Sequence, residues 1–202
     1  SPGISIVIST QRVLDTQVYI AEVTIEDVAC LRTGLAEGVF GRNVKETTSK
    51  MAEANDAILA VNGDFYGFRD KGFVMRNGYL YRDTARKEDE DALVVHRDGH
   101  LEIVREKEAD AQELAQDAVH IFSFGPGLVE EGELLVDEHS EVEHAMNSNP
   151  RTAIGEISPL HYILLVSDGR TDESKGLSLW ELARFMQKLG CETAYNLDGG
   201  GS

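Results

Sequence analysis

Residues 193–202 read Thr-Ala-Tyr-Asn-Leu-Asp-Gly-Gly-Gly-Ser, and the rest of the chain is best understood outward from them. The β-branched and aromatic content of residues 193–197 is typical of a short buried strand. Asp198 follows directly, and three glycines come next. Glycine has no Cβ, so successive backbone N–H groups in such a loop can face an anion. We therefore expect a ligand-binding loop at this strand end, with a flexible linker as the alternative.

The segment before this strand predicts a helix over residues 178–189. Ser178 is the N-cap and Glu181 completes a capping box, while Gly190 ends the helix. Residues 161–167 predict another strand, which ends at Asp168. A helix between two strands favours one parallel βαβ crossover, which would bring Asp168 and Asp198 to the same edge of a sheet.

The remaining chain predicts hairpins. Asn77-Gly78 and Asp98-Gly99 supply the positive φ angles of two-residue turns, and a third hairpin is expected across Glu131-Gly132. We also expect strands over residues 4–9, 17–25, 57–61, 119–124 and 151–157, helices over 50–56 and 106–118, and a solvated loop over 82–91. The predicted fold class is α+β: a mixed β-sheet with several hairpins, helices packed on it and one βαβ crossover near the C-terminus.

Composition limits the possible partners. The chain has 202 residues, expected to form a single domain over 1–202, with 19 Lys and Arg against 36 Asp and Glu and a net charge of −17. This acidity argues against nucleic acid or an anionic membrane as a partner, and we expect no membrane contact by the domain itself. A phosphate-bearing substrate would need local cations. The two cysteines, Cys30 and Cys191, are expected to be small buried apolar residues, although one bridge is possible.

Three aspartates follow predicted strands: Asp64, Asp168 and Asp198. Paired carboxylates suit a glycosidase, and carboxylates with an amide also suit a divalent cation. The alternative for each is an ordinary turn role. Arg151 begins a predicted strand and could hold a phosphate or carboxylate, or form a surface salt bridge. The six histidines show no zinc-type spacing.

Several motifs together resemble the phosphodiester glycosidase family. They are Ala-Val-Asn-Gly-Asp-Phe-Tyr at 60–66, Phe-Ser-Phe-Gly-Pro at 122–126, Asn-Pro-Arg-Thr-Ala-Ile-Gly at 149–155, Val-Ser-Asp-Gly-Arg at 166–170, the helix from Leu177 and residues 195–202. Their order covers roughly residues 57–202. Family members usually continue beyond Gly-Ser with a further strand, so a C-terminal strand is expected to be missing here.

The resemblance implies a hydrolase that releases a sugar from a sugar-1-phosphodiester. It also implies an extracellular or cell-surface location, like that of bacterial exopolysaccharide-related members. Asp198 would act as base or nucleophile, and no cofactor is certain beyond a possible divalent cation. The expected catalytic residues are Asp64, Arg151, Asp168 and Asp198. The expected substrate-binding residues are Asn62, Gly63, Gly125, Asn196, Gly199, Gly200, Gly201 and Ser202.

Two other functions stay open from the sequence. The same carboxylates could hold a metal ion in a phosphodiesterase that cuts at phosphorus. The third hypothesis is a non-catalytic module that binds a cell-surface glycan.

Overall fold

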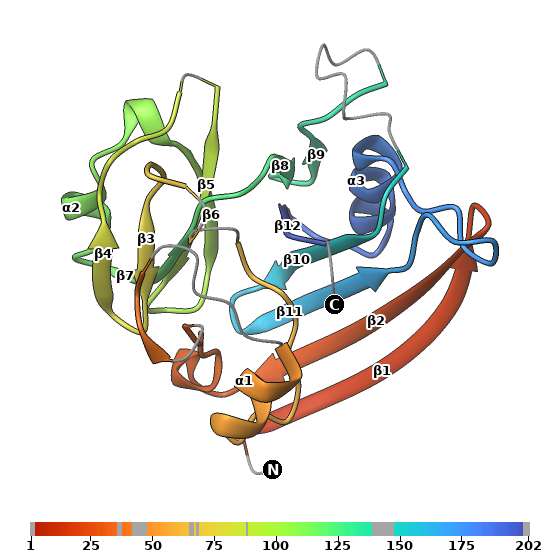
Figure 1. Cartoon of the computed structure of the whole chain (residues 1–202), viewed down its shortest axis with the longest axis horizontal. Coiled ribbons are helices and arrows are strands. Elements are labelled where there is room, and N and C mark those ends of the chain that lie inside the picture. The colour runs from red at the N-terminus through yellow and green to blue at the C-terminus, as the bar shows by residue number, and fades with distance from the viewer. Residues whose placement is uncertain are drawn as a thin grey trace.

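The computed structural model describes residues 3–35, 38–41, 48–64, 67, 69–87, 89–138 and 148–199. Three predicted site residues, Gly200, Gly201 and Ser202, lie outside the described residues. The described part contains two antiparallel sheets and few helices (Figure 1), an α+β fold as predicted.

The larger sheet has seven strands in the order β1-β2-β11-β10-β12-β8-β9. Their bounds are β1 Ile4–Val13, β2 Thr16–Ile25, β8 Gly127–Glu130, β9 Glu133–Leu134, β10 Arg151–Ser158, β11 His161–Ser167 and β12 Thr193–Leu197. Strand β2 alternates buried and exposed residues over most of its length because one side chain in two faces the core. All five residues of β12 are buried, as the apolar run predicts.

The smaller sheet has five strands in the order β4-β3-β7-β5-β6. Their bounds are β3 Val74–Arg76, β4 Tyr79–Arg82, β5 Asp91–His96, β6 Leu101–Arg105 and β7 Ala118–Phe122. The predicted Asn77-Gly78 and Asp98-Gly99 turns are both present. At the first turn, Asn77 (φ 49°) and Gly78 (φ 86°) both adopt the left-handed conformation that a two-residue turn requires. At the second, only Gly99 (φ 92°) does, and the loop has three residues between the paired His96 and His100.

The two sheets and two helices form four layers. One core lies between the sheets and joins residues of β2, β5, β6, β7, β10, β11 and β12. Helix α3 (Leu179–Lys188) packs on the other face of the larger sheet through Leu182, Ala183 and Met186. Helix α2 (Ala111–Leu114) covers the outer face of the smaller sheet. The remaining helical segments are α1 Thr48–Ala54, η1 Val28–Cys30 and η4 Glu106–Glu108.

The predicted crossover from β11 through α3 to β12 is present in a split form. Strand β10 lies between β11 and β12 and is antiparallel to both, so β11 and β12 run parallel without touching. The expected mixed sheet is therefore antiparallel at every strand pair of the described residues. The capping box of α3 forms as predicted: Glu181 N–H donates to Ser178 Oγ and Ser178 N–H donates to Glu181 Oε1.

Three local predictions differ from the structure. Residues 57–61 form no strand. The helix expected over 106–118 is reduced to η4 and α2, because Asp110 adopts an extended conformation and caps a new helix by accepting from Gln112 N–H. The loop expected to be solvated over 82–91 contains a buried residue, Arg86, which is held by an ion pair.

The cysteine prediction is wrong for one residue. Cys191 is buried, and burial raises its pKa to about 12, whereas Cys30 is exposed; both are free thiols. No helix in the described ranges is long and apolar enough to cross a membrane.

Candidate active site

The split crossover assembles one edge of the larger sheet. Arg151, the first residue of β10, is paired with Ser167, the last residue of β11. Thr152 is paired with Leu197, the last residue of β12. Asp168 and Asp198 follow β11 and β12, so both aspartates emerge at the edge where Arg151 begins the strand between them.

Three glycines allow separate segments to close around the start of β10. A Cβ on Gly199 would lie 2.4 Å from Pro150 O and 2.7 Å from Arg151 Cα. A Cβ on Gly169 would lie 2.5 Å from Pro150 N, and one on Gly176 would lie 2.8 Å from Asn149 O. These distances are far inside van der Waals contact, so only glycine fits. The Gly199 position is therefore needed for packing as well as for any exposure of its N–H.

The guanidinium of Arg151 is half-buried and oriented by the start of α3. Its Nε–H donates to Leu177 O at 3.0 Å, directly before the N-cap Ser178. Burial, together with the nearby charge of Arg170, lowers the pKa of Arg151 from 12.5 to about 10. Arg151 is thus still cationic at neutral pH, and Arg170 adds a second positive charge to this edge.

A hollow of about 190 Å³ lies beside this edge. It is lined by Pro150, Thr152, Val166, Ser167, Asp168, Gly169, Thr171 and Gly199. Asp168 is exposed, whereas Ser167 is only 2 % exposed and its Oγ has no hydrogen-bond partner among the described residues. Buried polar atoms without partners are uncommon in folded proteins, so this hydroxyl is available to a ligand or a water molecule.

The Asp64 carboxylate is held differently from the other two. Its Oδ1 accepts from Arg76 Nη2 at 2.5 Å, its Oδ2 accepts from Ser123 N–H at 2.9 Å, and its side chain is fully buried. Arg76 is also buried, donates to Ile121 O at 2.6 Å and stacks over the Phe122 ring. Because both oxygens of Asp64 are occupied, this residue anchors the loop over 62–64 to the smaller sheet.

That anchored loop reaches the terminal segment. Asp198 N–H donates to Gly63 O at 2.8 Å. Asn62 Oδ1 accepts from Thr48 Oγ1 at 2.6 Å and so joins the loop to α1. Asn62, Gly63, Asp64 and Asp198 are therefore parts of one connected structure.

Gly125 and Asn196 are also brought together. Gly125 N–H donates to Asn196 O at 3.1 Å, and Asn196 Nδ2 donates to Gly125 O at 2.9 Å. Asn196 is 3 % exposed, and its Oδ1 has no partner among the described residues. Like Ser167 Oγ, this amide oxygen is a buried acceptor, and no described residue donates a hydrogen bond to it.

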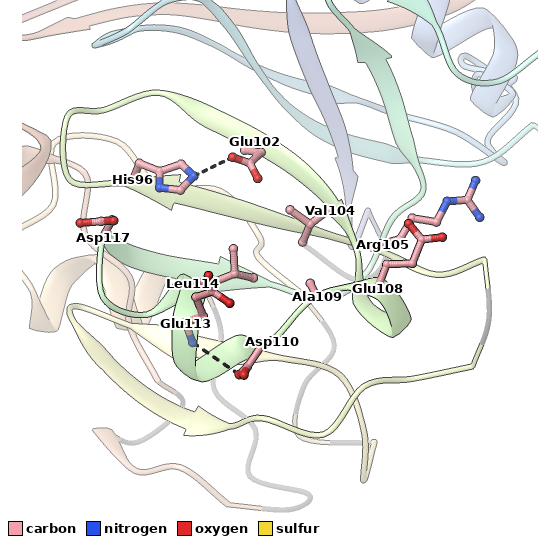
Figure 2. Close-up of a pocket in the computed structure, with 10 residues that line it drawn as sticks. All are labelled: His96, Glu102, Val104, Arg105, Glu108, Ala109, Asp110, Glu113, Leu114 and Asp117. Carbon is pink, nitrogen blue, oxygen red and sulfur yellow. Dashed lines mark hydrogen bonds and ion pairs between the residues drawn. The ribbon is translucent and has the colours of Figure 1, made fainter.

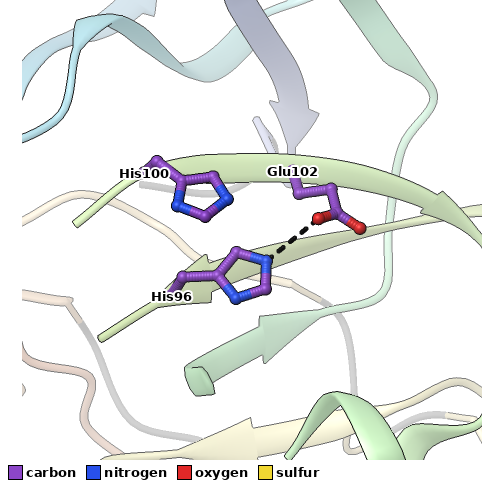
Figure 3. Close-up of side chains that lie close together, drawn as sticks. All are labelled: His96, His100 and Glu102. Atoms are coloured by element: carbon purple, nitrogen blue, oxygen red, sulfur yellow. Dashed lines mark hydrogen bonds and ion pairs between the residues drawn. The ribbon is translucent and has the colours of Figure 1, made fainter. Parts of the chain in front are cut away.

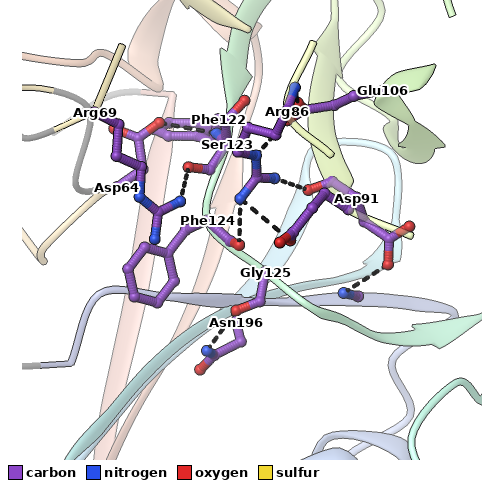
Figure 4. Close-up of polar contacts among 12 residues, drawn as sticks. Asp64, Arg69, Arg86, Asp91, Glu106, Phe122, Ser123, Phe124, Gly125 and Asn196 are labelled. Carbon is purple, nitrogen blue, oxygen red and sulfur yellow. Dashed lines mark hydrogen bonds and ion pairs between the residues drawn. The ribbon is translucent and has the colours of Figure 1, made fainter. Parts of the chain in front are cut away.

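A polar network that the sequence analysis missed joins the two sheets, and Figure 4 shows Arg86, Asp91 and Glu106 within it. Arg86 Nε donates to Glu106 Oε1 at 2.8 Å and its Nη2 donates to Asp91 O at 2.7 Å. Tyr195 Oη in β12 donates to the same Asp91 carbonyl at 2.7 Å and accepts from Phe124 N–H at 2.8 Å. The network thus fixes β12, and with it Asp198, to the smaller sheet.

The carboxylates of this edge do not form a metal-type cluster with one another. Within the described ranges, the histidine, cysteine and carboxylate atoms that converge as metal ligands belong to His96, His100 and Glu102, on a different sheet. The expected divalent cation thus gains no support from Asp64, Asp168 or Asp198.

The fold and this edge define an α+β protein with a candidate site at the ends of a split βαβ unit, where Arg151 begins β10 and Asp168 and Asp198 follow β11 and β12. The phosphodiester glycosidase family model matches residues 55–202, and the chain belongs to this family. Membership supports a glycosidase-type hydrolase.

Curated relatives agree with this assignment. The chain is 31% identical over 170 residues to an uncharacterized protein, YomE, derived from the SPbeta prophage of Bacillus subtilis, covering 81% of this chain and 26% of that protein. It is 27% identical over 175 residues to the human N-acetylglucosamine-1-phosphodiester alpha-N-acetylglucosaminidase, covering 78% and 33%. The chain spans about a quarter to a third of the length of these relatives.

Solved structures share the fold. The zebrafish N-acetylglucosamine-1-phosphodiester alpha-N-acetylglucosaminidase catalytic domain, auto-inhibited by its pro-peptide, aligns with a TM-score of 0.73 at 23% identity, covering 100% of this chain and 73% of that chain. A putative exported protein from Burkholderia pseudomallei aligns with a TM-score of 0.58 at 15% identity, covering 93% and 69%.

Proposed function

We propose that this chain is a hydrolase that releases a sugar from a sugar-1-phosphodiester. The observation that carries the proposal is the meeting of Arg151, Asp168 and Asp198 at one edge of the larger sheet in a member of the phosphodiester glycosidase family. The human relative is named for that reaction on N-acetylglucosamine.

The charges of this edge suit a phosphodiester. The chain carries a net charge of −17, which repels phosphate at long range. Arg151 and its neighbour Arg170 supply local positive charge, and a guanidinium can hold a phosphate through two parallel hydrogen bonds. The Gly199 N–H, and those of Gly200 to Ser202 beyond the described residues, are proposed as further donors to the phosphate oxygens.

The reaction places water oxygen on the anomeric carbon. The bond between that carbon and the phosphate oxygen breaks, and the phosphate leaves as a monoester. Asp198 is proposed as the base that takes the proton of water, or as the nucleophile that water later displaces. Asp168, exposed at the rim of the hollow, is proposed to stabilise positive charge that develops on the sugar ring.

The other residues have binding or positioning roles. Ser167 Oγ and Asn196 Oδ1, two buried oxygens without hydrogen-bond partners among the described residues, are proposed to bond to substrate or to an ordered water. Asp64 is proposed as a positioning residue, because both of its oxygens are already bonded and its loop holds Asp198 through Gly63. An extracellular location is part of the same proposal.

Sugar release from N-acetylglucosamine-1-phosphate esterified to a second alcohol tests the proposal. The wild-type chain is expected to release the free sugar, and Asp198→Asn is expected to abolish release while the substrate still binds. Arg151→Lys keeps the charge but loses the planar fork, so it should raise KM. Saturable binding without release by the wild-type chain would instead indicate a glycan-binding module.

A further inference from the structure

Two histidines and a glutamate converge on the β5–β6 hairpin (Figure 3). The ligand atoms of His96, His100 and Glu102 all lie within 4.8 Å of one another. His96 Nε2 and Glu102 Oε2 are 3.1 Å apart, and the two imidazole rings stack with centroids separated by 4.2 Å. All three side chains remain in contact with solvent.

The hairpin itself creates this cluster. His96 ends β5, and its N–H donates to His100 O at 3.0 Å across the Asp98-Gly99 turn. The two histidines are therefore direct cross-strand neighbours, and Glu102, two residues after His100, lies on the same face. The turn converts a separation of four residues in the sequence into a contact between facing side chains.

A neighbouring carboxylate sets up one ring for metal binding. Asp98 Oδ1 lies 2.5 Å from His100 Nδ1 and also accepts from His100 N–H at 3.1 Å. Imidazoles that bind metals commonly donate their second N–H to a carboxylate in this way, which fixes the ring and leaves the other nitrogen as the ligand. With Nδ1–H held by Asp98, His100 presents Nε2.

The surroundings favour a cation and leave it accessible. A hollow of about 520 Å³ lies between this hairpin and α2, and both His96 and Glu102 line it (Figure 2). Four more carboxylates line the hollow, against one arginine, Arg105. They belong to Glu108, Asp110, Glu113 and Asp117.

We propose that His96, His100 and Glu102 bind a divalent metal ion of borderline softness, of which Zn²⁺ is the best match to two imidazoles and one carboxylate. Because the two rings are stacked nearly parallel, metal binding requires them to rotate until their in-plane lone pairs point at one ion, and a water molecule is proposed for the fourth position. The ion then clamps β5 to β6 at the end of the hairpin.

This metal site is separate from the proposed active site. The hairpin turn contacts the start of β11, where Tyr162 Oη donates to Gly99 O and Leu160 lies against Gly99. Asp168 follows the other end of β11, a seven-residue strand of about 20 Å. Zinc binding and sugar release can therefore be measured independently, and the failure of one leaves the other standing.

The structure offers a matched control. His161 Nε2 and Glu22 Oε1 lie 2.7 Å apart on the larger sheet, and among the described residues no third metal-ligating side chain converges on this histidine–glutamate pair. If any histidine–glutamate pair binds Zn²⁺, substitution of His161 should weaken zinc binding as much as substitution of His96 does.

Isothermal titration of the metal-free chain with zinc chloride, followed by competition with a chelator, tests the proposal. The wild-type chain and His161→Ala are expected to bind one Zn²⁺ with equal affinity. His96→Ala and His100→Ala should each bind at least about 100-fold more weakly, and Asp98→Asn about tenfold more weakly, the usual range for an outer carboxylate. Glu102→Gln keeps the shape of the side chain and should also weaken binding.

Circular dichroism and the thermal midpoint without zinc distinguish lost ligands from lost folding. Each variant should keep the wild-type spectrum, and zinc should raise the midpoint of the wild-type chain but not that of His96→Ala. The proposal is overturned if the wild-type chain binds no zinc, or if folded His96→Ala and His100→Ala bind it as tightly as His161→Ala does.

Discussion

Asp198 N–H donates a 2.8 Å hydrogen bond to Gly63 O, and this bond joins the end of the larger sheet to a loop anchored on the smaller one. The anchor is the buried ion pair between Asp64 and Arg76 of β3. The position of the proposed catalytic carboxylate therefore depends on a charge pair from the other sheet. Asp64 holds the loop in place, whereas Asp198 is the proposed catalytic carboxylate. Substitution of Asp64 should therefore affect mainly stability, and substitution of Asp198 mainly activity.

Asp64→Asn is expected to destabilise the protein by about 3–5 kcal/mol, because it removes the negative charge with which the buried Arg76 guanidinium forms an ion pair. Urea unfolding followed by circular dichroism measures the change. Asp198→Asn serves as the matched control: Asp198 is only partly buried, so its stability should change by less than about 1 kcal/mol while activity is lost. Equal stability losses in the two variants would refute the division of roles.

Gly199→Ala is expected to cost about 1–3 kcal/mol and to abolish activity, because the new Cβ would overlap Pro150 O and displace the start of β10. Gly63→Ala is the control for stability, since its Cβ would make an ordinary 3.5 Å contact with the Phe122 ring. Thermal unfolding of both variants checks the difference. A Gly199→Ala protein as stable as Gly63→Ala would show that the two segments are not packed as described.

Tyr195→Phe should lower stability by about 1–3 kcal/mol. The hydroxyl is fully buried and serves both Asp91 O and Phe124 N–H, which would be left without this partner. Tyr79→Phe is the control, because Tyr79 is 64% exposed. Chemical unfolding compares the two, and a loss no larger than that of Tyr79→Phe would show that the network contributes nothing to joining the sheets.

Stability should also depend on pH through His120. Its Nε2–H donates to Leu31 O at 2.7 Å and its Nδ1 accepts from Asn77 N–H at 3.1 Å, so the buried ring is neutral. Burial lowers the pKa of His120 from 6.5 to about 4. The unfolded chain takes up a proton between these values and the folded chain does not, so stability falls as pH falls through this window.

The expected loss from this residue is about 2 kcal/mol between pH 7 and pH 5. Free energies of unfolding measured at both pH values for the wild-type chain and His120→Gln isolate it from the contributions of the carboxylates. The variant, which cannot be protonated at this position, should lose less stability by that amount. Identical losses in the two proteins would mean that His120 titrates normally in the fold.

Much of the larger sheet could be predicted because local signals agree with one another there. The capping box at Ser178 and the apolar run at Thr193–Leu197 each specify their own geometry. In the smaller sheet, the Asn77-Gly78 and Asp98-Gly99 turns do the same for two hairpins. The signals in the larger sheet placed Asp168 and Asp198 at one edge, and the insertion of β10 between their strands put Arg151 there as well.

The rest depended on contacts that no local pattern contains. The partner of Asp64 is Arg76, which sits in a hairpin and shows no sequence sign of being buried. Arg86 lies in a charge-rich stretch typical of solvated loops, and only the distant Glu106 accounts for its burial. The histidine cluster is an exception. The predicted Asp98-Gly99 turn places His96 opposite His100, so this local pattern is enough to predict that the two side chains lie together.

The central claim is that water attacks the sugar carbon and that phosphate is the leaving group. Hydrolysis of an N-acetylglucosamine-1-phosphodiester in water enriched in oxygen-18, with both products analysed by mass spectrometry, tests it most directly. The account predicts the label in the released sugar and none in the phosphate monoester. Label in the phosphate would show attack at phosphorus and contradict it.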